Sequence, residues 1–557
     1  MIQNVTRARQ STTAIDRLYI TMRHMFHRGT YRPTGQSGKM IQELLLQLNP
    51  EIYGSMADPE KVELDGLFYV LDRLPDGITE TPYIHFTSNE GVDFTKFKPI
   101  IPPKRRRICY RVDEDQMNIE VTRGRSEIYD TLTHLTFLYN ESDKIRERAF
   151  NKQTQKMSRV WQKIEEIALS DMKLSTKDRD VALMHLSTIL GRTYNETVNA
   201  YKYFSTETDK EKFFKIIYWM GQTSQQDFTG FKRREITFSP ILRERIGHHM
   251  VGEKWANTIK KTLSENGLMS RPLHIISANM HSVSNMVYAF DAMKLKFKDV
   301  NEFDIYKDLS SSKNKELRDT VSHYSINNGM IFIPDTSGTN IDIQIIDLKK
   351  VDLKNTAFST LKTAPEDVLI VMDYAFGEQA FEVMDELLKP YKSKGTSTMM
   401  NVHSVSIMGK AGILTGKKGD IMVPTSHVIE GPTDNYVFKN ELTAEDFKGS
   451  RLGVYEGPMI TVLGTSLQNK DVLEYFKDSS WSAIGLEMEG GHYQKAIQIA
   501  SKIRHHISPD VKVLYAYYAS DNPLETGSTL ASGGLGLTGV KPTYLITKMI
   551  LKKILGA

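Results

Sequence analysis

Two carboxylates stand where a strand-like run meets a helix in the second half of the chain. Glu487 and Glu489 are two residues apart in the segment SAIGLEMEGG, so we expect them to face the same way, with Met488 opposite. An ionised carboxylate at a strand end accepts hydrogen bonds from two neighbouring hydroxyls, a geometry that suits sugar recognition. A carboxylate that stabilises the amino end of the following helix fits the same residues. The pattern leaves both interpretations open.

A third carboxylate ends the apolar run Val513–Ala519. Ser520 and Asp521 follow this run, and Pro523 prevents the strand from continuing. At the mouth of a sheet, burial raises the pKa of a carboxyl group, which suits Asp521 to the role of a general acid. Ser-Asp-Asn-Pro is also favourable turn chemistry, and taken alone the segment favours the turn.

A glycine-rich segment follows an apolar run at Ile407–Val423. Gly409 and Gly412 begin it, and two more glycines follow within ten residues. Glycines just past a strand let backbone N–H groups approach an anion or a planar base closely. Lys410 adds a positive charge for a phosphate group. A plain loop between two strands is the alternative, with equal weight.

A histidine follows the first predicted strand of this half, in the segment Leu273–Asn285. His281 and Ser284 are placed to reach a ligand from the exit loop, although one loop histidine does not define a site.

No metal or cofactor motif is predicted elsewhere. His24 and His27 are three apart but have no third ligand nearby in the sequence, and the only cysteine is Cys109.

The elements that must position these residues change character along the chain. Residues 1–235 are mostly helical in pattern and predict an N-terminal domain for oligomerisation or regulation, and residues 236–271 predict a connecting helical segment. Over residues 272–557, short β-rich runs alternate with amphipathic stretches. This alternation predicts an α/β domain with a mixed, largely parallel sheet flanked by helices. Ligands of such sheets bind at the carboxyl ends of the strands.

Composition narrows the class of protein. The 557 residues carry 72 Lys+Arg and 68 Asp+Glu, a formal charge of +4, and this slight excess says little about partners. No secretory signal and no stretch of ~18 apolar residues is found, so we predict a cytoplasmic protein without a membrane anchor. The basic run Lys104–Arg107 favours a solvated loop or a subunit contact over nucleic-acid binding, because interleaved aromatic residues are missing.

Together these segments resemble the nucleoside phosphorylase and nucleosidase superfamily, and most nearly its AMP nucleosidases. Glu487–Gly490 is similar to the superfamily's glutamate-methionine-glutamate segment. Ser520–Leu524 is similar to the serine-aspartate-x-proline-leucine segment of AMP nucleosidases, and Met408–Gly412 to the glycine-rich purine loop. The resemblance covers about Pro272–Ala557.

The resemblance implies a role for each matching residue. Met488 and Glu489 would hold the ribose, with Glu489 accepting hydrogen bonds from the 2′ and 3′ hydroxyls. Asp521 would donate a proton toward N7 of the purine as the glycosidic bond breaks. The remaining substrate contacts would be Ser520, Gly409, Lys410, Ala411, Gly412 and His281.

Two departures from the family pattern accompany the leading hypothesis. Lys410 stands where relatives have a small polar residue or a histidine, and no acid is found near Asn279–Ser282, where some nucleosidases carry a water-activating carboxylate. The leading hypothesis is hydrolysis of the N-glycosidic bond of a purine nucleotide or nucleoside by a homo-oligomer, with no metal or organic cofactor. The alternatives are a purine nucleoside phosphorylase that uses inorganic phosphate, and a non-catalytic nucleotide-sensing or scaffold protein.

Overall fold

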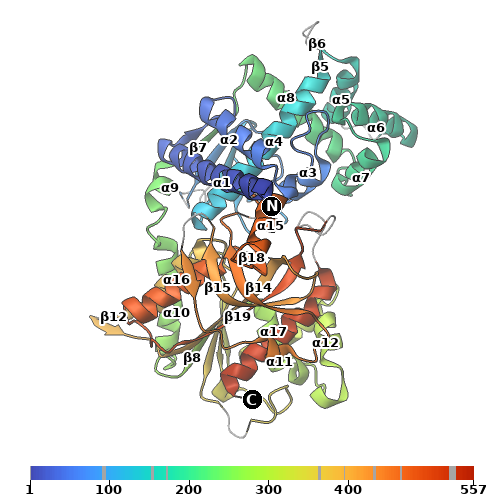
Figure 1. Cartoon of the computed structure of the whole chain (residues 1–557). Coiled ribbons are helices and arrows are strands. Elements are labelled where there is room, and N and C mark those ends of the chain that lie inside the picture. The colour runs from blue at the N-terminus through green and yellow to red at the C-terminus, as the bar shows by residue number, and fades with distance from the viewer. Residues whose placement is uncertain are drawn as a thin grey trace. The chain divides into compact units, whose positions relative to one another are not determined.

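The chain forms two compact units, each with its own buried core (Figure 1). The computed structural model describes residues 2–88, 90, 96–151, 156–170, 174–361, 365–393, 395–430, 434–464, 467–525 and 535–556. Unit 1 comprises Met1–Ile246 and Ser466–Val472, and unit 2 comprises Gly247–Thr465 and Leu473–Ala557. Among the described residues, no helix is both long and apolar enough to cross a membrane.

Unit 1 combines long helices with short strands. Its elements are α1 (Ile2–Arg28), β1 (Thr30–Tyr31), α2 (Gln36–Leu48), η1 (Glu51–Tyr53), α3 (Leu64–Leu71), β2 (Tyr83–Thr87), β3 (Cys109–Arg111), β4 (Gln116–Glu120), α4 (Gly124–Ala149), β5 (Phe150–Asn151), β6 (Lys156–Met157), α5 (Arg159–Leu169), α6 (Thr176–Leu190), α7 (Tyr194–Phe204), α8 (Lys212–Thr229), β7 (Glu235–Phe238) and α9 (Pro240–Arg245). Five of the described strands form a sheet in the order β1-β7-β2-β4-β3.

Local sequence signals explain several helix ends in unit 1. Gly191 closes α6 in the left-handed conformation with φ 63°, which glycine adopts readily. Thr193 and Glu196 then form a reciprocal capping box that begins α7. The five-stranded sheet was not part of the mostly helical prediction. Its strands have two to five residues, too few to show an alternating pattern.

The basic run at residues 104–107 is not a simple solvated loop. Arg107 is fully buried, and its Nε donates to Glu127 Oε1 over 3.1 Å. Arg105 is largely buried and bonds to the Asp130 carboxylate through Nε and Nη2, each over 3.3 Å. Two of the four basic side chains are therefore used inside unit 1, because α4 brings carboxylates against them. A nucleic-acid patch built on this run loses half of its charge.

Unit 2 is built on one large mixed sheet. Its elements are α10 (Met250–Glu265), β8 (Leu273–Ser277), α11 (Met280–Ala292), η2 (Phe297–Asp299), α12 (Glu302–Ser310), α13 (Lys315–Asn327), β9 (Met330–Ile333), β10 (Ile343–Asp347), η3 (Leu348–Lys350), β11 (Val368–Met372), α14 (Gln379–Leu388), β12 (Tyr391–Ser393), β13 (Thr396–Thr398), β14 (Val402–Ile413), β15 (Ile421–Ile429), β16 (Asn435–Val437), η4 (Ala444–Phe447), β17 (Val454–Thr461), β18 (Gly485–Glu487), α16 (Gly490–Gln498), η5 (Ile499–Ile503), β19 (Lys512–Asp521), η7 (Gly536–Gly539) and α17 (Val540–Leu555). The helix α15 (Lys470–Asp478) begins in the unit 1 segment and ends in unit 2.

The strand order is β16-β15-β17-β18-β14-β8-β11-β10-β9, and β19 pairs with β14 and β15. The strands β11, β8, β14 and β19 run parallel to their neighbours in that series. The edge strands β9 and β16 and the inner strand β10 are antiparallel to their partners, and so is the β14–β18 pair. The predicted mixed sheet with helices on its faces is thus confirmed for unit 2, but it is not largely parallel, because five of the pairings among its described strands are parallel and five are antiparallel.

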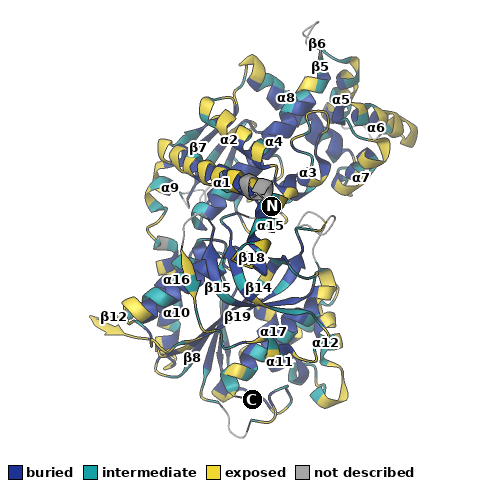
Figure 2. Cartoon of the chain, viewed as in Figure 1, coloured by how far each residue is buried: buried dark blue, intermediate teal, exposed yellow. Residues whose placement is uncertain are grey.

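Helices cover both faces of this sheet, and the strands bury apolar residues on each face. Leu273 and Ile275 of β8 pack with α10, α14 and α16, whereas Ile276 packs with α11 and α17. Alternate residues of a strand point to opposite faces, so a strand buried on both sides is a continuous apolar run. Figure 2 shows the buried sheet between helices whose outer faces are exposed.

The burial of β11 predicts that the stability of unit 2 is sensitive to shortening the side chains of this strand. Ile370 is fully buried in β11, whereas Ile326 of α13 is 51% exposed. We expect Ile370→Ala to lower the free energy of unfolding by about 3 kcal/mol, through lost burial and a residual cavity. Ile326→Ala is the matched control and is expected to cost less than about 1 kcal/mol. Urea denaturation followed by circular dichroism checks this, and equal losses would contradict the assigned core.

Candidate functional site

Strand register brings the predicted site residues to one edge of the unit 2 sheet. β14 and β19 run parallel, with Gly409 opposite Tyr517, Ala411 opposite Ala519 and Gly412 opposite Asp521. On its other side, β14 pairs antiparallel with β18, and Gly412 lies opposite Leu486. β18 and β19, each more than 70 residues after β14 in the sequence, therefore both pair with it near residues 409–412. This is the carboxyl-end edge at which ligands of such sheets bind.

Glycines in β14 allow this approach. The β14–β19 register shifts between Ala411 and Gly412. A Cβ atom on Gly412 would lie 3.2 Å from the Leu486 side chain and 3.6 Å from Asp521 Oδ2, so the strand passes directly beside that carboxylate. A Cβ on Gly409 would touch the rings of Tyr517 and Tyr374 at 3.7 and 3.9 Å. The two glycines leave backbone, rather than side chains, facing the edge.

Asp521 is buried at the end of β19. Its Oδ1 accepts a hydrogen bond from Ser520 Oγ over 2.6 Å, and the same hydroxyl lies 3.3 Å from the Ala411 carbonyl oxygen. Burial raises the pKa of Asp521, while the Ser520 bond and the charges of Lys418 and Lys410 act in the opposite direction. A carboxyl group with a raised pKa holds its proton at a higher pH and can donate it to a leaving group.

The turn that follows Asp521 depends on a different side chain. Asn522 Oδ1 accepts the backbone N–H of Leu524 over 3.0 Å, and Asn522 Nδ2 donates to the Gly416 carbonyl oxygen over 2.8 Å. The turn chemistry noted in the sequence is therefore carried by Asn522, and the Asp521 carboxyl faces β14 instead. The turn interpretation and a role for Asp521 are compatible.

The glycine-rich segment after β14 is anchored by Asp420. The Asp420 carboxylate accepts backbone N–H groups from Lys417 over 3.0 Å and from Gly453 over 2.9 Å. Its own carbonyl oxygen accepts the N–H of Ala519 over 2.8 Å, which ties the segment to β19. These bonds hold Lys418 where its charge acts on Asp521.

Glu487 and Glu489 do not share a strand face, so that expectation was wrong. β18 ends at Glu487, and Glu489 occupies the N-cap position of α16 with φ −121° and ψ −29°. Glu487 Oε2 accepts the backbone N–H groups of Glu489, over 2.6 Å, and of Gly490. The carboxylate that stabilises the amino end of the helix is therefore Glu487. Glu489 makes no capping bond of its own.

The Glu489 carboxyl turns toward another segment. Its Oε1 accepts the backbone N–H of Gly377 over 2.9 Å, from the turn before α14. Burial and the negative charge of Glu487 raise the pKa of Glu489 to about 7, against the lowering effect of Gly377 and Lys410. In contrast, although burial alone would raise the pKa of Glu487, the nearby His427 ring and the hydrogen bonds from Gly490 and Thr461 lower it. One carboxylate is held ionised, and its neighbour exchanges a proton near neutral pH.

Of the other predicted residues, Lys410 is the one whose charge acts on both acids. Lys410 is exposed, and its charge lowers the pKa of both Glu489 and Asp521. Met488 and Ala411 are buried. For His281 the structure gives a place at the same edge: it is exposed near the amino end of α11, and its backbone N–H donates to the Asn279 side chain over 3.1 Å.

Several residues of this edge were not named as site residues from the sequence. Gly377 and Tyr374 come from the end of β11, and His427 and Thr461 from two other strands. For Gly377 the available signal was a glycine between a strand and a helix, which is weak alone. His427 and Thr461 gave none, because their partner Glu487 is 60 and 26 residues away in the sequence.

A cluster in unit 2 has donor types that suit a metal ion. His249, Asp385 and Glu386 bring their ligand atoms within 4.8 Å of one another. Arg504 Nη1 lies 2.7 Å from Asp385 Oδ1, and Lys389 Nζ lies 3.3 Å from Asp385 Oδ2. Because cations of the chain already balance these carboxylates, the cluster is an ion-pair network.

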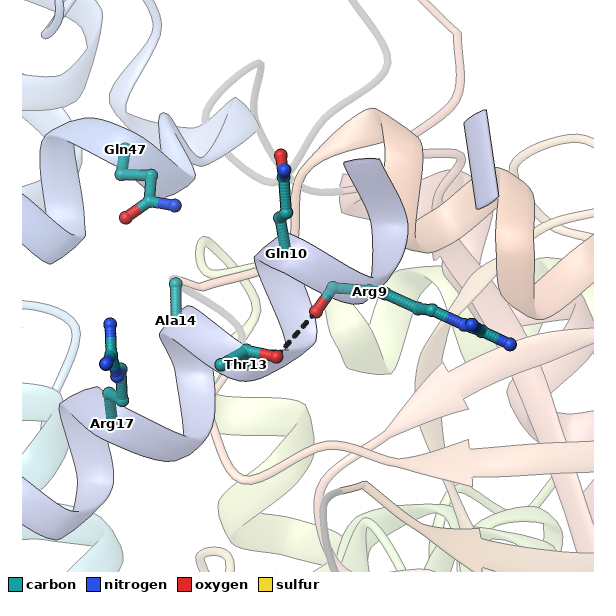
Figure 3. Close-up of a pocket in the computed structure, with 6 residues that line it drawn as sticks. All are labelled: Arg9, Gln10, Thr13, Ala14, Arg17 and Gln47. Carbon is teal, nitrogen blue, oxygen red and sulfur yellow. Dashed lines mark hydrogen bonds between the residues drawn. The ribbon is translucent and has the colours of Figure 1, made fainter. Parts of the chain in front are cut away.

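Unit 1 contains an open cavity of about 350 Å³ along α1 and α2. Figure 3 shows its six lining residues, among them Gln10, Arg17 and Gln47. The Arg9 side chain extends away from the others, and its carbonyl oxygen accepts the Thr13 hydroxyl over 2.9 Å. The charged side chains here are exposed, and the cavity contains none of the carboxylates described above.

Comparison with known proteins places the chain in a family. The model of a family of unknown function, DUF6909, matches residues 39–296 and 303–556, which is most of the chain. The chain belongs to this family. The match extends over both units, so a DUF6909 protein contains unit 1 as well as the sheet that carries the carboxylates. No curated protein matches its sequence.

Solved structures similar to this DUF6909 protein cover about half of it. The 5′-methylthioadenosine/S-adenosylhomocysteine nucleosidase of Campylobacter jejuni is 11% identical, with a TM-score of 0.32 over 52% of this chain and 100% of that chain. A futalosine hydrolase mutant of Helicobacter pylori is 12% identical, with a TM-score of 0.31 over 51% of this chain and 99% of that one. The Arabidopsis thaliana 5′-methylthioadenosine nucleosidase is 10% identical, with a TM-score of 0.31 over 52% and 97% of the two chains.

The charges around the two acids predict the effect of removing Lys410. We expect Lys410→Met to raise the pKa of both Glu489 and Asp521, because the ammonium group lowers both. Titration of ¹³C-labelled carboxyl groups by NMR measures the two values. Lys418→Met is the matched control and is expected to move Asp521 more than Glu489, since its charge acts on Asp521. If the pKa values of Glu489 and Asp521 were both unchanged in Lys410→Met, Lys410 would not belong to the site.

Proposed function

We propose that unit 2 hydrolyses the N-glycosidic bond of a purine nucleotide or nucleoside, as AMP nucleosidases do. The observation that carries the proposal is that β19, which ends in Asp521, and β18, which leads to Glu489, both pair with β14, and that Lys410 of β14 acts on both carboxyl groups. Acid catalysis at a glycosidic bond requires one group that donates a proton and one that stabilises the sugar cation. The two acids supply these functions.

Asp521 acts on the base. Burial raises its pKa, and the Ser520 hydroxyl fixes its Oδ1, so that the carboxyl presents a proton toward N7 of the purine. As the bond between C1′ and N9 breaks, the base leaves neutral rather than as an anion. Water supplies the hydroxyl group of C1′, and its remaining proton restores the Asp521 acid over the cycle.

Glu489 acts on the sugar. Its carboxylate accepts hydrogen bonds from the 2′ and 3′ hydroxyls and lies close to the ribosyl group as that group becomes cationic. Only the ionised form accepts both bonds, so substrate affinity is expected to rise with pH through the pKa of Glu489, about 7. The backbone of Gly409–Gly412 lines the base, with Met488 beside the ribose.

Lys410 favours a phosphorylated substrate. Its exposed ammonium lies within the electrostatic range of both acids and is suited to bind a 5′-phosphate. The same observation supports a second candidate, a phosphorylase in which inorganic phosphate replaces water.

The hydrolase and the phosphorylase are distinguished by chromatography of the free base released from AMP, adenosine, inosine and guanosine, each with and without phosphate. No release from any of them would support a nucleotide-sensing or scaffold role.

Removing the acid is expected to abolish most turnover. We expect Asp521→Asn to lower kcat for base release by about 10²- to 10⁴-fold, because an amide cannot donate the proton, and to leave ligand affinity within a few-fold. Isothermal titration measures affinity, and chromatography measures turnover. Asp510→Asn, at an exposed aspartate, is the matched control and should behave as wild type. Near-normal turnover by Asp521→Asn would exclude Asp521 as the acid.

A further inference from the structure

Behind Glu489 lies a buried polar group made of Glu487, His427 and Thr461, which we call the Glu487 cluster. The side chains of Glu487 and His427 are 1% and 0% exposed, and Thr461 is fully buried. The three come from β18, β15 and β17, so the sheet itself fixes their positions. None of them has a role in the proposed chemistry. Burying polar groups this deeply costs free energy of folding unless they form hydrogen bonds, so the cluster needs a structural or functional explanation.

The Glu487 carboxylate holds the turn that carries Glu489. Its Oε2 accepts the backbone N–H of Glu489 over 2.6 Å and that of Gly490, so one oxygen binds two successive amides after Met488. Thr461 Oγ1 donates to Oε1 and accepts the N–H of Gly491 over 2.9 Å. Three successive amides are thereby bound by the cluster. The backbone at Glu489 cannot rotate without breaking these bonds.

His427 closes the cluster from behind. Its Nδ1 lies 3.4 Å from Glu487 Oε1, and its ring stacks on Phe438 with centroids 5.4 Å apart. A Cβ atom on Gly490 would lie 2.4 Å from His427 Cε1 and from the Tyr517 hydroxyl, so only glycine lets the turn approach this closely. The turn and the imidazole are thus packed against each other.

The cluster also sets the electrostatic surroundings of Glu489. The negative charge of Glu487 acts against ionisation of Glu489, while Lys410 and the Gly377 N–H favour ionisation. The Tyr493 and Tyr517 phenols, from α16 and β19, lie within electrostatic range of Glu489 as well. Glu487 differs from the other groups because it both carries a charge and accepts a hydrogen bond from the Glu489 backbone N–H.

We propose that Glu487, His427 and Thr461 are positioning residues, which fix the Met488–Glu489 turn so that the Glu489 carboxylate meets the ribose hydroxyls in one orientation. The role rests on the proposed function, since it gives Glu489 a sugar to bind. It goes beyond that function by assigning a purpose to buried polar side chains that have no part in the proposed chemistry. The cluster acts on affinity and on its pH dependence through Glu489, while proton transfer from Asp521 is left unchanged.

The first test is Glu487→Gln in the full chain, which keeps the shape of the side chain and removes its charge. We expect the pKa of Glu489, followed by ¹³C NMR of the carboxyl group and assigned with Glu489→Gln, to fall below its value of about 7. The pH at which AMP affinity is half-maximal should fall with it. At a pH where Glu489 is ionised in both proteins, KM for AMP should rise about tenfold through the loosened turn, with kcat changed less.

A milder variant and a matched control accompany this test. Thr461→Val removes one hydroxyl from the cluster and keeps every charge, so KM should rise about threefold with a smaller pKa shift than in Glu487→Gln. Glu445→Gln, at a 70% exposed glutamate paired with Lys448, should change neither quantity. Melting temperatures of all variants report whether the fold is kept, and Thr461→Val decides the matter if Glu487→Gln does not fold.

The outcomes separate this inference from the proposed function. A folded Glu487→Gln protein with an unchanged Glu489 titration and KM within twofold of wild type would show that the cluster only packs the core, and would overturn the proposal. The NMR titration needs no turnover. If wild type released no base from any substrate, the proposed function would fail. A Glu489 titration that still moved in Glu487→Gln would then support the structural coupling alone.

Discussion

The parallel pairing of β14 with β19 is the constraint on which the rest of the candidate site depends. The register that sets Gly412 opposite Asp521 also decides which backbone atoms of β14 the carboxyl faces. Antiparallel pairing of the same residues with β18 then leads the chain to Glu487 and Glu489. A slip of one residue in either pairing would turn these side chains to the other face of the sheet. The continuous apolar burial of the central strands on both faces holds the register.

Given that register, three carboxylates receive three different environments. Glu487 is bonded by donors that lower its pKa and stays ionised, whereas Glu489 combines a hydrogen bond from the Gly377 N–H with the repulsion of Glu487. Asp521 is buried beside a hydroxyl, with Lys410 and Lys418 in electrostatic range. Pairs of acids whose surroundings separate their pKa values are typical of sites that combine proton donation with charge stabilisation. Burial raises the pKa of both Asp521 and Glu489, so the proposed division of roles rests on their places, Asp521 at the end of β19 and Glu489 at the start of α16.

The sequence predicted the parts that depend on local pattern. Alternating β-rich and amphipathic runs predicted the α/β architecture of unit 2, and three short segments pointed to Asp521, Glu489 and the glycines of β14. The alternation of residues alone placed Glu487 and Glu489 on one strand face, because the end of β18 depends on the neighbouring strands β14 and β17. It also gave no sign of His427 or Thr461, whose only connection to Glu487 is spatial. The inward orientation of Arg107 was hidden for the same reason, since its partner Glu127 is supplied by α4.

The most direct test of the account is the fate of the oxygen atom that attacks the sugar. The protein would be incubated with AMP in ¹⁸O-labelled water without phosphate, and the products analysed by mass spectrometry. The account predicts adenine together with ribose 5-phosphate that carries one ¹⁸O atom at C1, formed by wild type and lost in Asp521→Asn. Intact AMP after prolonged incubation, in a protein that binds AMP, would contradict the claim that this edge of the sheet cleaves glycosidic bonds.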